Sequence, residues 1–529
     1  MALSPPRRIA LTEENRRWWT LGAMCFALFM IMLDNTVVNV ALPSIQKSLG
    51  ASISGLEWTV NAYTLAFAVL LVTGGRLGDI FGRRRMFLFG VVTFGLSSAF
   101  IGLSQSEAWL VAGRAVQGVG AAFMMPATLS IISNAFPPHE RGRAIGTWAG
   151  VSAMALAIGP VVGGFLVENV SWQSIFFLNV PVAVVAVAVT LFAAHESRDE
   201  TSTHHVDLPG VATVTIGLAS LVLALVEGNA WGWGSASILA LFAVAVAALA
   251  GFAVAERRSV EPMVDFQFFR SRSFLGANVV AFIVSFAMLA MFFFLALYMQ
   301  NVKGYSPLEA GVRFLPSTAV IIVIGPIAGR LADRIGPRPL MTLGLLLTAG
   351  SLFWQGHLTT DTSYGLLVGA FVLMGLGMGL VMSPMSTAAM NAVEQTKAGV
   401  ASGILSMSRM VGGTFGVAVM GALITALGKS KLHDLLPALP AGQRDTLAES
   451  LGAGGTQVSG QIGDAVQQAF VSALNDGLRM ASVVAAIGAA LAWALISDEV
   501  PARDRIPVEV APEGAAAAAG EPVPDAAAA

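Results

Sequence analysis

Two charged side chains interrupt segments that are otherwise apolar. Asp34 lies within residues 33–43, and Arg114 lies within residues 113–120. A charged side chain in lipid is costly unless it is paired or hydrated, and an acid can also be protonated. Burial raises the pKa of a carboxyl group and a nearby cation lowers it, so an acid held between these influences can take up and release a proton. We therefore interpret Asp34 as a candidate for proton coupling; the alternative is an acid that only caps or pairs.

Arg114 needs a hydrogen-bond acceptor if it is buried. Asp34 or backbone carbonyl groups could supply it, and the glycine and alanine residues around Arg114 favour close helix packing. Asn35 and Asn39 lie one helical turn apart, so they could line the same cavity.

A dense stretch of glycine and charge occupies residues 75–85, and residues 329–338 repeat its Gly, Arg, Leu and Asp pattern. The repeat predicts two halves built on one plan. Asp79 is expected at the membrane edge, paired with Arg83, with Arg84 or with basic residues of the opposite half, where it would latch one conformation. Simple control of topology by the arginines is a compatible alternative. The candidate gating residues are Gly75, Asp79, Gly82, Arg83, Arg84 and Asp333.

A glycine–proline element follows later in the chain, where Gly159 and Pro160 precede Gly163 and Gly164. Gly-Pro inside a membrane helix bends it, and paired glycines remove side chains from one face. These four residues predict either a hinge at a sealed interface or an ordinary packing seam.

The composition narrows the class of protein. Of 529 residues, 55% are hydrophobic and 12% are charged, whereas about 25% are charged in a soluble domain. This predicts a polytopic protein of the lipid bilayer. No basic surface favours nucleic acid, Cys25 is the single cysteine, and no P-loop pattern is present. We expect no metal, no cofactor and no enzymatic activity, and we interpret His204 and His205 as part of a solvated loop.

Apolar segments long enough to cross a bilayer recur along the chain, since a helix needs about 20 residues to do so. They predict about fourteen helices, at 18–41, 56–75, 86–104, 108–132, 144–167, 173–194, 208–227, 236–255, 274–299, 308–329, 339–357, 364–388, 400–427 and 475–497. Arginine gathers in alternate loops, which predicts that these loops and both termini are cytoplasmic in a multi-pass protein of the cell membrane.

The predicted organisation begins with a cytoplasmic segment at 1–17 and a first six-helix bundle at 18–194. A linker with two additional helices at 195–272 leads to a second bundle at 273–497. This bundle includes an outer loop at 428–473, which we interpret as solvated, with a role in substrate entry or release as the alternative. The tail at 498–529 lacks apolar periodicity and is predicted to be disordered.

Taken in order, these motifs resemble the major facilitator superfamily, and within it the fourteen-helix drug–proton antiporters of the multidrug efflux type. The resemblance covers about residues 18–497. It is carried by residues 33–43 (first-helix motif), 58–63 (fourteen-helix branch), 75–85 (cytoplasmic signature), 113–120 (proton-relay motif) and 159–164 (fifth-helix motif typical of exporters).

The resemblance implies an all-α fold of two six-helix bundles with two extra helices between them, and alternating access around a central cavity. It assigns proton coupling to Asp34 and Arg114, and conformational control to Asp79 and its loop. The candidate residues for the substrate cavity are Asp34, Asn35, Asn39, Asn61, Tyr63, Gln117 and Arg409.

The expected function is therefore proton-coupled export of amphiphilic organic compounds such as antibiotics, by a monomer. The alternatives are an importer or facilitator of a small metabolite and a non-transporting membrane sensor, because a fold alone does not set direction. Some multidrug members carry a second acid in the helix that matches 308–329, but residues 314–322 of this chain contain none, and Arg313 and Arg409 add positive charge. This favours neutral, anionic or monocationic substrates over dications.

Overall fold

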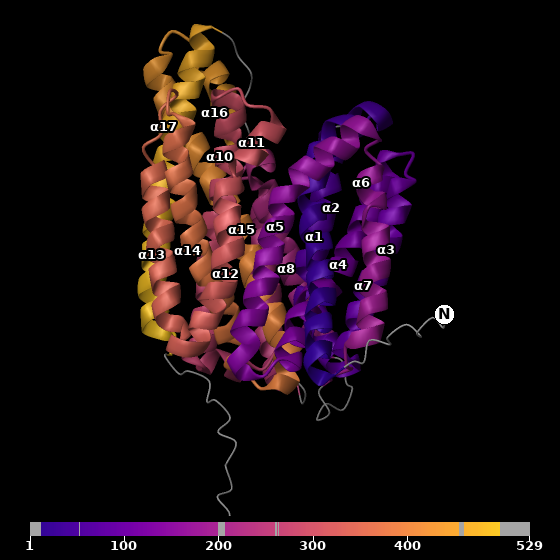
Figure 1. Cartoon of the computed structure of the whole chain (residues 1–529). Coiled ribbons are helices and arrows are strands. Elements are labelled where there is room, and N and C mark those ends of the chain that lie inside the picture. The colour runs from indigo at the N-terminus through magenta and orange to yellow at the C-terminus, as the bar shows by residue number, and fades with distance from the viewer. Residues whose placement is uncertain are drawn as a thin grey trace, which may run out of the picture.

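The chain folds into a bundle of long helices. The computed structural model describes residues 12–51, 53–198, 207–259, 262, 264–453 and 460–497, and these contain no β-strand. Twelve of the described helices are long and apolar enough to cross a membrane. Helices α5 and α13 lie among them in the bundle (Figure 1), so the fourteen predicted segments are all helical. The predicted disordered tail, residues 1–11 of the N-terminal segment, and His204 and His205 lie outside the described residues.

The helices form two halves and one additional pair. The first half contains α1 (Glu13–Leu49), α2 (Ile53–Phe81), α3 (Arg83–Gly102), α4 (Glu107–Ala135), α5 (Pro138–Asn169), α6 (Ser174–Phe177) and α7 (Asn179–Ala193). The additional pair is α8 (Leu208–Trp231) and α9 (Ala236–Arg258). The second half contains η1 (Phe266–Arg270), α10 (Arg272–Leu297), η2 (Tyr298–Val302), α11 (Pro307–Arg313), α12 (Leu315–Ile335), α13 (Pro337–Gln355), α14 (Tyr364–Asn391), η3 (Gln395–Lys397), α15 (Ala398–Leu435), α16 (Ala441–Ala453) and α17 (Gln461–Leu495).

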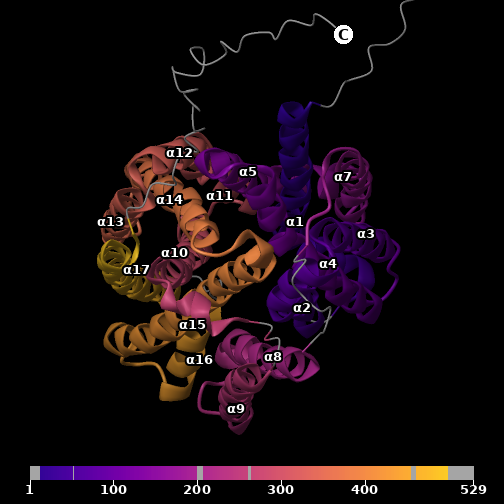
Figure 2. The ribbon, with the colours of Figure 1, turned by 90° about the horizontal axis from the view of Figure 1, so that it is seen from below.

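The extra pair lies outside the main bundle. Seen along the helix axes in Figure 2, α8 packs against α2 of the first half and α15 of the second, and α9 packs on the outer side of α8. Helix α9 is largely exposed and strongly apolar, as expected for a surface that faces lipid. The predicted arrangement of two bundles and an additional pair is therefore confirmed.

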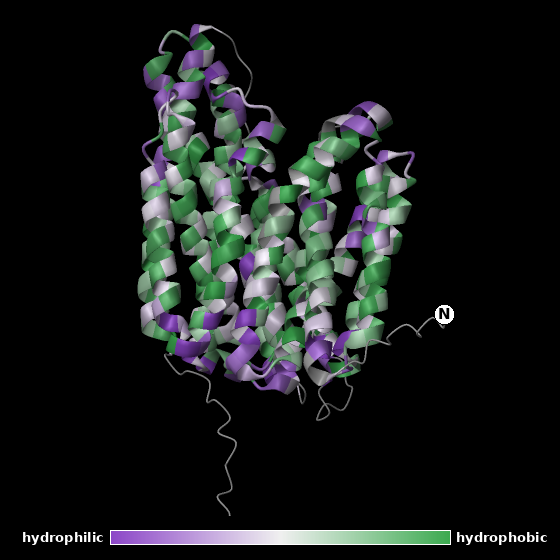
Figure 3. Cartoon of the chain, viewed as in Figure 1, coloured by the Kyte–Doolittle hydropathy of each residue, from purple (hydrophilic) through white to green (hydrophobic). Residues whose placement is uncertain are grey.

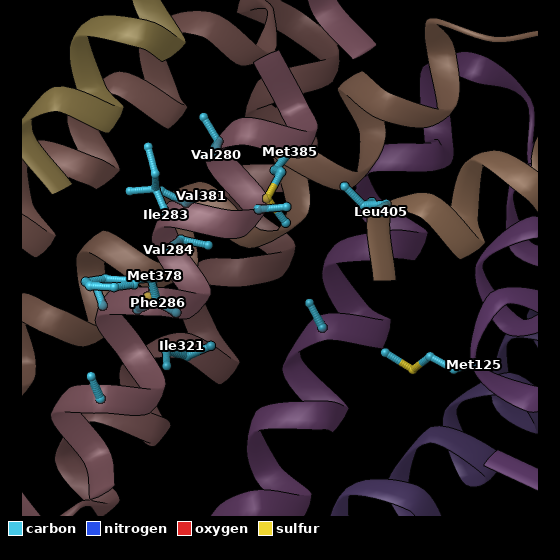
Figure 4. Close-up of a cluster of buried hydrophobic side chains, with 14 of the residues drawn as sticks. Met125, Val280, Ile283, Val284, Phe286, Ile321, Met378, Val381, Met385 and Leu405 are labelled. Carbon is cyan, nitrogen blue, oxygen red and sulfur yellow. The ribbon is translucent and has the colours of Figure 1, made fainter. Parts of the chain in front are cut away.

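Polar residues concentrate at the two ends of the bundle, and apolar residues cover the region between them (Figure 3). We call the end that carries the α2–α3 and α12–α13 turns the basic end, because Arg83, Arg84, Arg334 and Arg338 lie there. The opposite end carries α16 (Figure 1). Figure 4 shows part of the apolar core, in which Met385 and Leu405 of the second half belong to the same cluster as Met125 of α4.

The predicted outer loop at 428–473 differs from expectation, because most of its described part is helical. Helix α15 continues to Leu435, α16 follows, and α17 starts at Gln461. The segment is polar overall, but Leu432, Ala448 and Leu451 are buried. A side chain at Gly428 would lie 2.6 Å from Leu451, so this glycine makes room for α16 to pack on α15.

Backbones of the two halves touch closely near the basic end. A Cβ atom at Gly146 of α5 would lie 2.6 Å from the carbonyl oxygen of Gly325 on α12, and one at Gly75 of α2 would lie 2.3 Å from that of Gly399 on α15. Real Cβ contacts are never this short, so larger residues would push the halves apart. The halves diverge toward the α16 end (Figure 1).

We expect Gly146→Ala to destabilise the protein by about 1–3 kcal/mol, because the added methyl group overpacks the α5–α12 contact. Gly164→Ala is the matched control, since a Cβ atom at this buried glycine of the same helix meets nothing within 4 Å. The measurement is the unfolding midpoint of each variant in detergent. Equal midpoints for the two variants would contradict the proposed close contact.

Candidate functional site

The centre of the candidate site is an ion pair that is enclosed within the first half. Arg114 of α4 donates from Nη1 to Asp34 Oδ2 of α1 at 2.5 Å, and Arg114 and Asp34 are 1% and 3% exposed. Arg114 also donates from Nε to the carbonyl oxygen of Thr59 on α2 at 3.0 Å. Both acceptors that the sequence analysis considered for Arg114, Asp34 and a backbone carbonyl, are therefore used.

Amide and hydroxyl groups complete the coordination of the acid. Gln117 and Asn179 donate to Asp34 Oδ1 at 3.0 and 3.1 Å. The same two amides donate to Ser98 Oγ at 2.8 and 3.3 Å. The site thus joins α1, α3, α4 and α7, and each carboxylate oxygen of Asp34 has at least one donor.

An aromatic ring closes one side of this cluster. The guanidinium carbon of Arg114 lies 4.2 Å from the ring centroid of Tyr63, and Tyr63 is buried. Cation–π contacts of this kind stabilise a desolvated cation by about 2 kcal/mol. Tyr63 and Gln117 therefore belong to the enclosed ion-pair cluster.

Sequence reasoning missed three members of the cluster, Thr59, Ser98 and Asn179. Thr59 contributes only its backbone carbonyl, which no sequence pattern reveals. Asn179 offered a signal, because an amide at the start of the apolar helix α7 needs a polar partner.

Three other cavity candidates donate hydrogen bonds to groups outside the cluster. Asn35 donates to Ile31 O and Asn39 to Asn35 O, so both amides bond along α1, and Asn39 is exposed. Asn61 of α2 donates to Glu227 of α8 at 3.4 Å. This contact ties the first half to the additional helix pair.

Arg409 belongs to the second half but reaches the first. Its guanidinium carbon lies 5.6 Å from the ring centroid of Trp148 on α5. Arg409 thus contacts the first half through α5, and its place in one cavity with Asp34 stays a prediction.

The basic end is closed by Asp79, which is fully buried on α2. Its carboxylate accepts from Arg83 at 2.8 Å and from the backbone amides of Gly399 and Val400 at 2.9 and 2.8 Å. These amides lie in the first turn of α15, where N–H groups lack partners within the helix and favour an anion. The expected pairing of Asp79 with Arg83 is present, and the opposite half supplies backbone amides to the acid.

Arg83 strengthens the same junction. It donates to the carbonyl oxygens of Gln395 and Thr396 at 2.6 and 2.7 Å, just before α15 begins. Arg84 instead bonds within the first half, to Leu191 O. Gly82, which separates α2 from α3, has a φ of 109°, a backbone conformation that strongly favours glycine.

Asp333 forms the equivalent contact in the second half. It accepts from the backbone amide of Gly142 on α5 at 3.2 Å, while Ser383 of α14 donates to Gly142 O at 3.0 Å. Each copy of the sequence repeat, at 75–85 and at 329–338, therefore supplies an acid that accepts a hydrogen bond from the opposite half.

The glycines of α5 pack against α1. A Cβ atom at Gly159 would overlap the hydroxyl of Thr36, and one at Gly163 would lie 3.1 Å from Val37, whereas Gly164 has nothing within 4 Å. Helix α5 is continuous through Gly159 and Pro160. Gly159 and Gly163 thus make a close helix seam next to the segment of α1 that carries Asp34.

Two helical halves that meet at one end, with an ion pair enclosed in one of them, define a polytopic membrane protein of the transporter class. The model of the Major Facilitator Superfamily matches residues 24–417. The chain belongs to the Major Facilitator Superfamily.

Similar proteins are export and resistance proteins. The tetracenomycin C resistance and export protein of Streptomyces glaucescens is 37% identical, over 94% of each chain. The multidrug resistance protein Stp of Mycobacterium tuberculosis is 38% identical over 81% of this chain and 80% of its own. Among solved structures, the proton:xylose symporter XylE has a TM-score of 0.62 at 13% identity, over 92% of this chain and 97% of its own, which shows the fold alone.

We expect Asp79→Asn to loosen the basic end, because an asparagine amide replaces an anion that accepts from two backbone amides. The reporter is a Ser402→Cys variant in a Cys25→Ala background, because Ser402 is buried in the closed junction. Opening of the basic end is measured as the rate at which a maleimide added on that side labels the cysteine. The loss of charge-assisted hydrogen bonds, about 1.5–3 kcal/mol, corresponds to a rate increase of about tenfold or more.

Arg84→Gln is the control for this measurement, since its side chain bonds within the first half. Substrate binding should survive in Asp79→Asn because the acid lies far from the Asp34 cluster. Loss of binding with unchanged labelling would contradict the gating role.

Proposed function

We propose that the protein is a proton-coupled antiporter that exports amphiphilic organic compounds across the cell membrane by alternating access. The observation that carries this proposal is the enclosed pair of Asp34 and Arg114. The similar proteins that are named for tetracenomycin C export and for multidrug resistance support export of drug-like compounds. Similarity to a proton:xylose symporter supports only the fold and leaves direction open.

Proton uptake acts through the charge of Asp34. A protonated carboxyl group no longer offers a full negative charge to Arg114, which also donates to Thr59 O and Gln117 Oε1. Removing one partner of a buried ion pair costs about 3–5 kcal/mol. This energy is large enough to move a conformational equilibrium by several powers of ten. Proton binding at Asp34 thereby changes how α1 and α4 pack.

The two ends of the bundle provide the alternating gates. In this structure the basic end is held shut by Asp79 and Asp333, while the halves diverge at the α16 end (Figure 1). The concentration of arginine at the basic end favours its placement in the cytoplasm, with both chain termini. The conformation is then outward-facing, and the exporter acts as a monomer.

We expect Asp34→Asn to abolish efflux driven by a pH gradient in proteoliposomes, to the level of protein-free vesicles. Asparagine keeps the size of the side chain but cannot exchange a proton. Substrate counterflow without a pH gradient should persist, which separates loss of coupling from loss of transport. Asp476→Asn, an acid in an exposed pair with Arg479, is the matched control. Full gradient-driven efflux by Asp34→Asn would refute proton coupling at this residue.

The exporter should prefer neutral, anionic or monocationic amphiphiles over dications. The acid Asp34 is already bonded to Arg114, and Arg409 adds positive charge at the boundary of the halves. Repulsion between like charges is at least about fourfold stronger where the effective dielectric constant is about 20 than in water. The measurement is competition against a fluorescent monocation with matched neutral and dicationic compounds. Tenfold better competition by the dications would point to Glu227 as an additional acid of the cavity.

A further inference from the structure

One guanidinium nitrogen of Arg409 and the indole nitrogen of Trp148 are buried hydrogen-bond donors at the boundary of the two halves. Arg409 lies on α15 and Trp148 on α5. The Arg409 Nη2 and Trp148 Nε1 atoms are both buried, and neither has a hydrogen-bond partner among the described residues. Trp148 is 2% exposed. A buried donor without an acceptor costs about 1–3 kcal/mol, and more when it is charged.

The acids of the surrounding helices do not supply the missing acceptor. Helices α10 and α14 contain no Asp or Glu, and the single acid of α12, Asp333, lies at the basic end. Asp34 is bonded to Arg114 and two amides, and Asp79 is bonded to Arg83 and α15. The protein thus holds a guanidinium near the middle of the membrane without a carboxylate partner in the described part of the chain.

This pair lies where the closely packed part of the boundary ends: Trp148 stands between Gly146 and Gly150 on α5, inside the seam, and Arg409 lies beyond Gly403 on α15. On α15 the close contacts with α2 extend to Gly403, and on α5 those with α12 extend to Gly150. Arg409 follows Gly403 by six residues, which is about 9 Å along a helix. It therefore lies just beyond the closed seam, on the side of the α16 end. Apolar Met125, Met385 and Leu405 lie in the neighbouring core (Figure 4).

We propose that Arg409 and Trp148 form an anion-recognition site, which binds the acidic group of an aromatic compound that carries a carboxylate or an acidic phenol. One oxygen of the acid accepts from Arg409 Nη2 and the other from Trp148 Nε1. The apolar body packs against the methionine and leucine side chains. The proposal rests on the proposed export function, to which it adds the chemical class of the substrate.

The test compares binding of aromatic acids with their neutral amides. The probes are acid–amide pairs built on naphthalene, anthracene and pyrene, titrated calorimetrically at pH 7 into the full-length protein in nanodiscs, with empty nanodiscs as blank. Wild-type protein should bind at least one acid about tenfold more tightly than its amide, because charge-assisted hydrogen bonds contribute about 1.5–3 kcal/mol. Absence of this preference in every pair overturns the proposal.

Variants of the two donors test whether Arg409 and Trp148 cause the preference for the acid over its amide. Arg409→Gln should abolish it, Arg409→Lys should retain part of it, and Trp148→Phe should reduce it several-fold while keeping an apolar ring. Arg313→Gln is the matched control, since Arg313 packs on Tyr305 at 3.6 Å at the end of α11, and it should keep the full preference. Loss of the preference in Arg313→Gln, or its survival in Arg409→Gln, overturns the assignment.

Separate measurements distinguish effects on folding from effects on proton-coupled transport. Removal of an unpaired buried charge is not expected to lower the unfolding midpoint, so Arg409→Gln should be at least as stable as wild type. The binding assay contains no pH gradient. An acid preference without gradient-driven efflux therefore refutes the export function alone, whereas efflux without an acid preference refutes the anion site alone. Altered transport by Arg409→Gln with an unchanged acid preference would make Arg409 a conformational residue and overturn the proposal.

Discussion

The bilayer cannot hydrate a charge, so every ionised group between its surfaces depends on a partner that the protein provides. The pair of Asp34 and Arg114 is the clearest consequence. Helices α4 and α7 donate to the carboxylate on α1, Ser98 of α3 accepts from the same amides, and α2 adds a carbonyl oxygen and a ring to the guanidinium. A change of charge at Asp34 therefore affects the packing of a whole half, which is what a coupling device requires.

The same constraint explains how the two halves hold together. Glycines bring backbones into contact at the basic end, and Asp79 and Asp333 then satisfy amides of the opposite half. The polar contacts of Asp79 and Asp333 lie at the basic end, and apolar side chains of both halves, including Met125, Met385 and Leu405, share one cluster beside them.

Arg114 and Arg409 are both arginines within the helix bundle, but their interaction partners differ. Arg114 has an acid, a carbonyl oxygen, an amide and an aromatic ring as partners. Arg409 has a tryptophan ring, at the boundary between the halves. A fully paired arginine serves the architecture and its coupling, whereas an arginine left without an acceptor at a boundary is suited to a ligand that brings its own charge.

The sequence by itself determined the membrane class, the positions of the helices and the two-part plan, and it singled out Asp34 and Arg114 as charged groups that need partners. Apolar length, the repeat at residues 75–85 and 329–338, and the cost of a buried charge each act locally, so each can be recognised without a structure. Only the tertiary structure decided which groups complete the site. Asn179 reaches Asp34 from α7 while Ser98 accepts from the same amide, Asp79 bonds to backbone amides of α15 in addition to Arg83, and most of the described part of the polar segment at 428–473 is helical. Backbone donors and carbonyls are the same in every residue, so their use depends on helix placement, which no local pattern encodes.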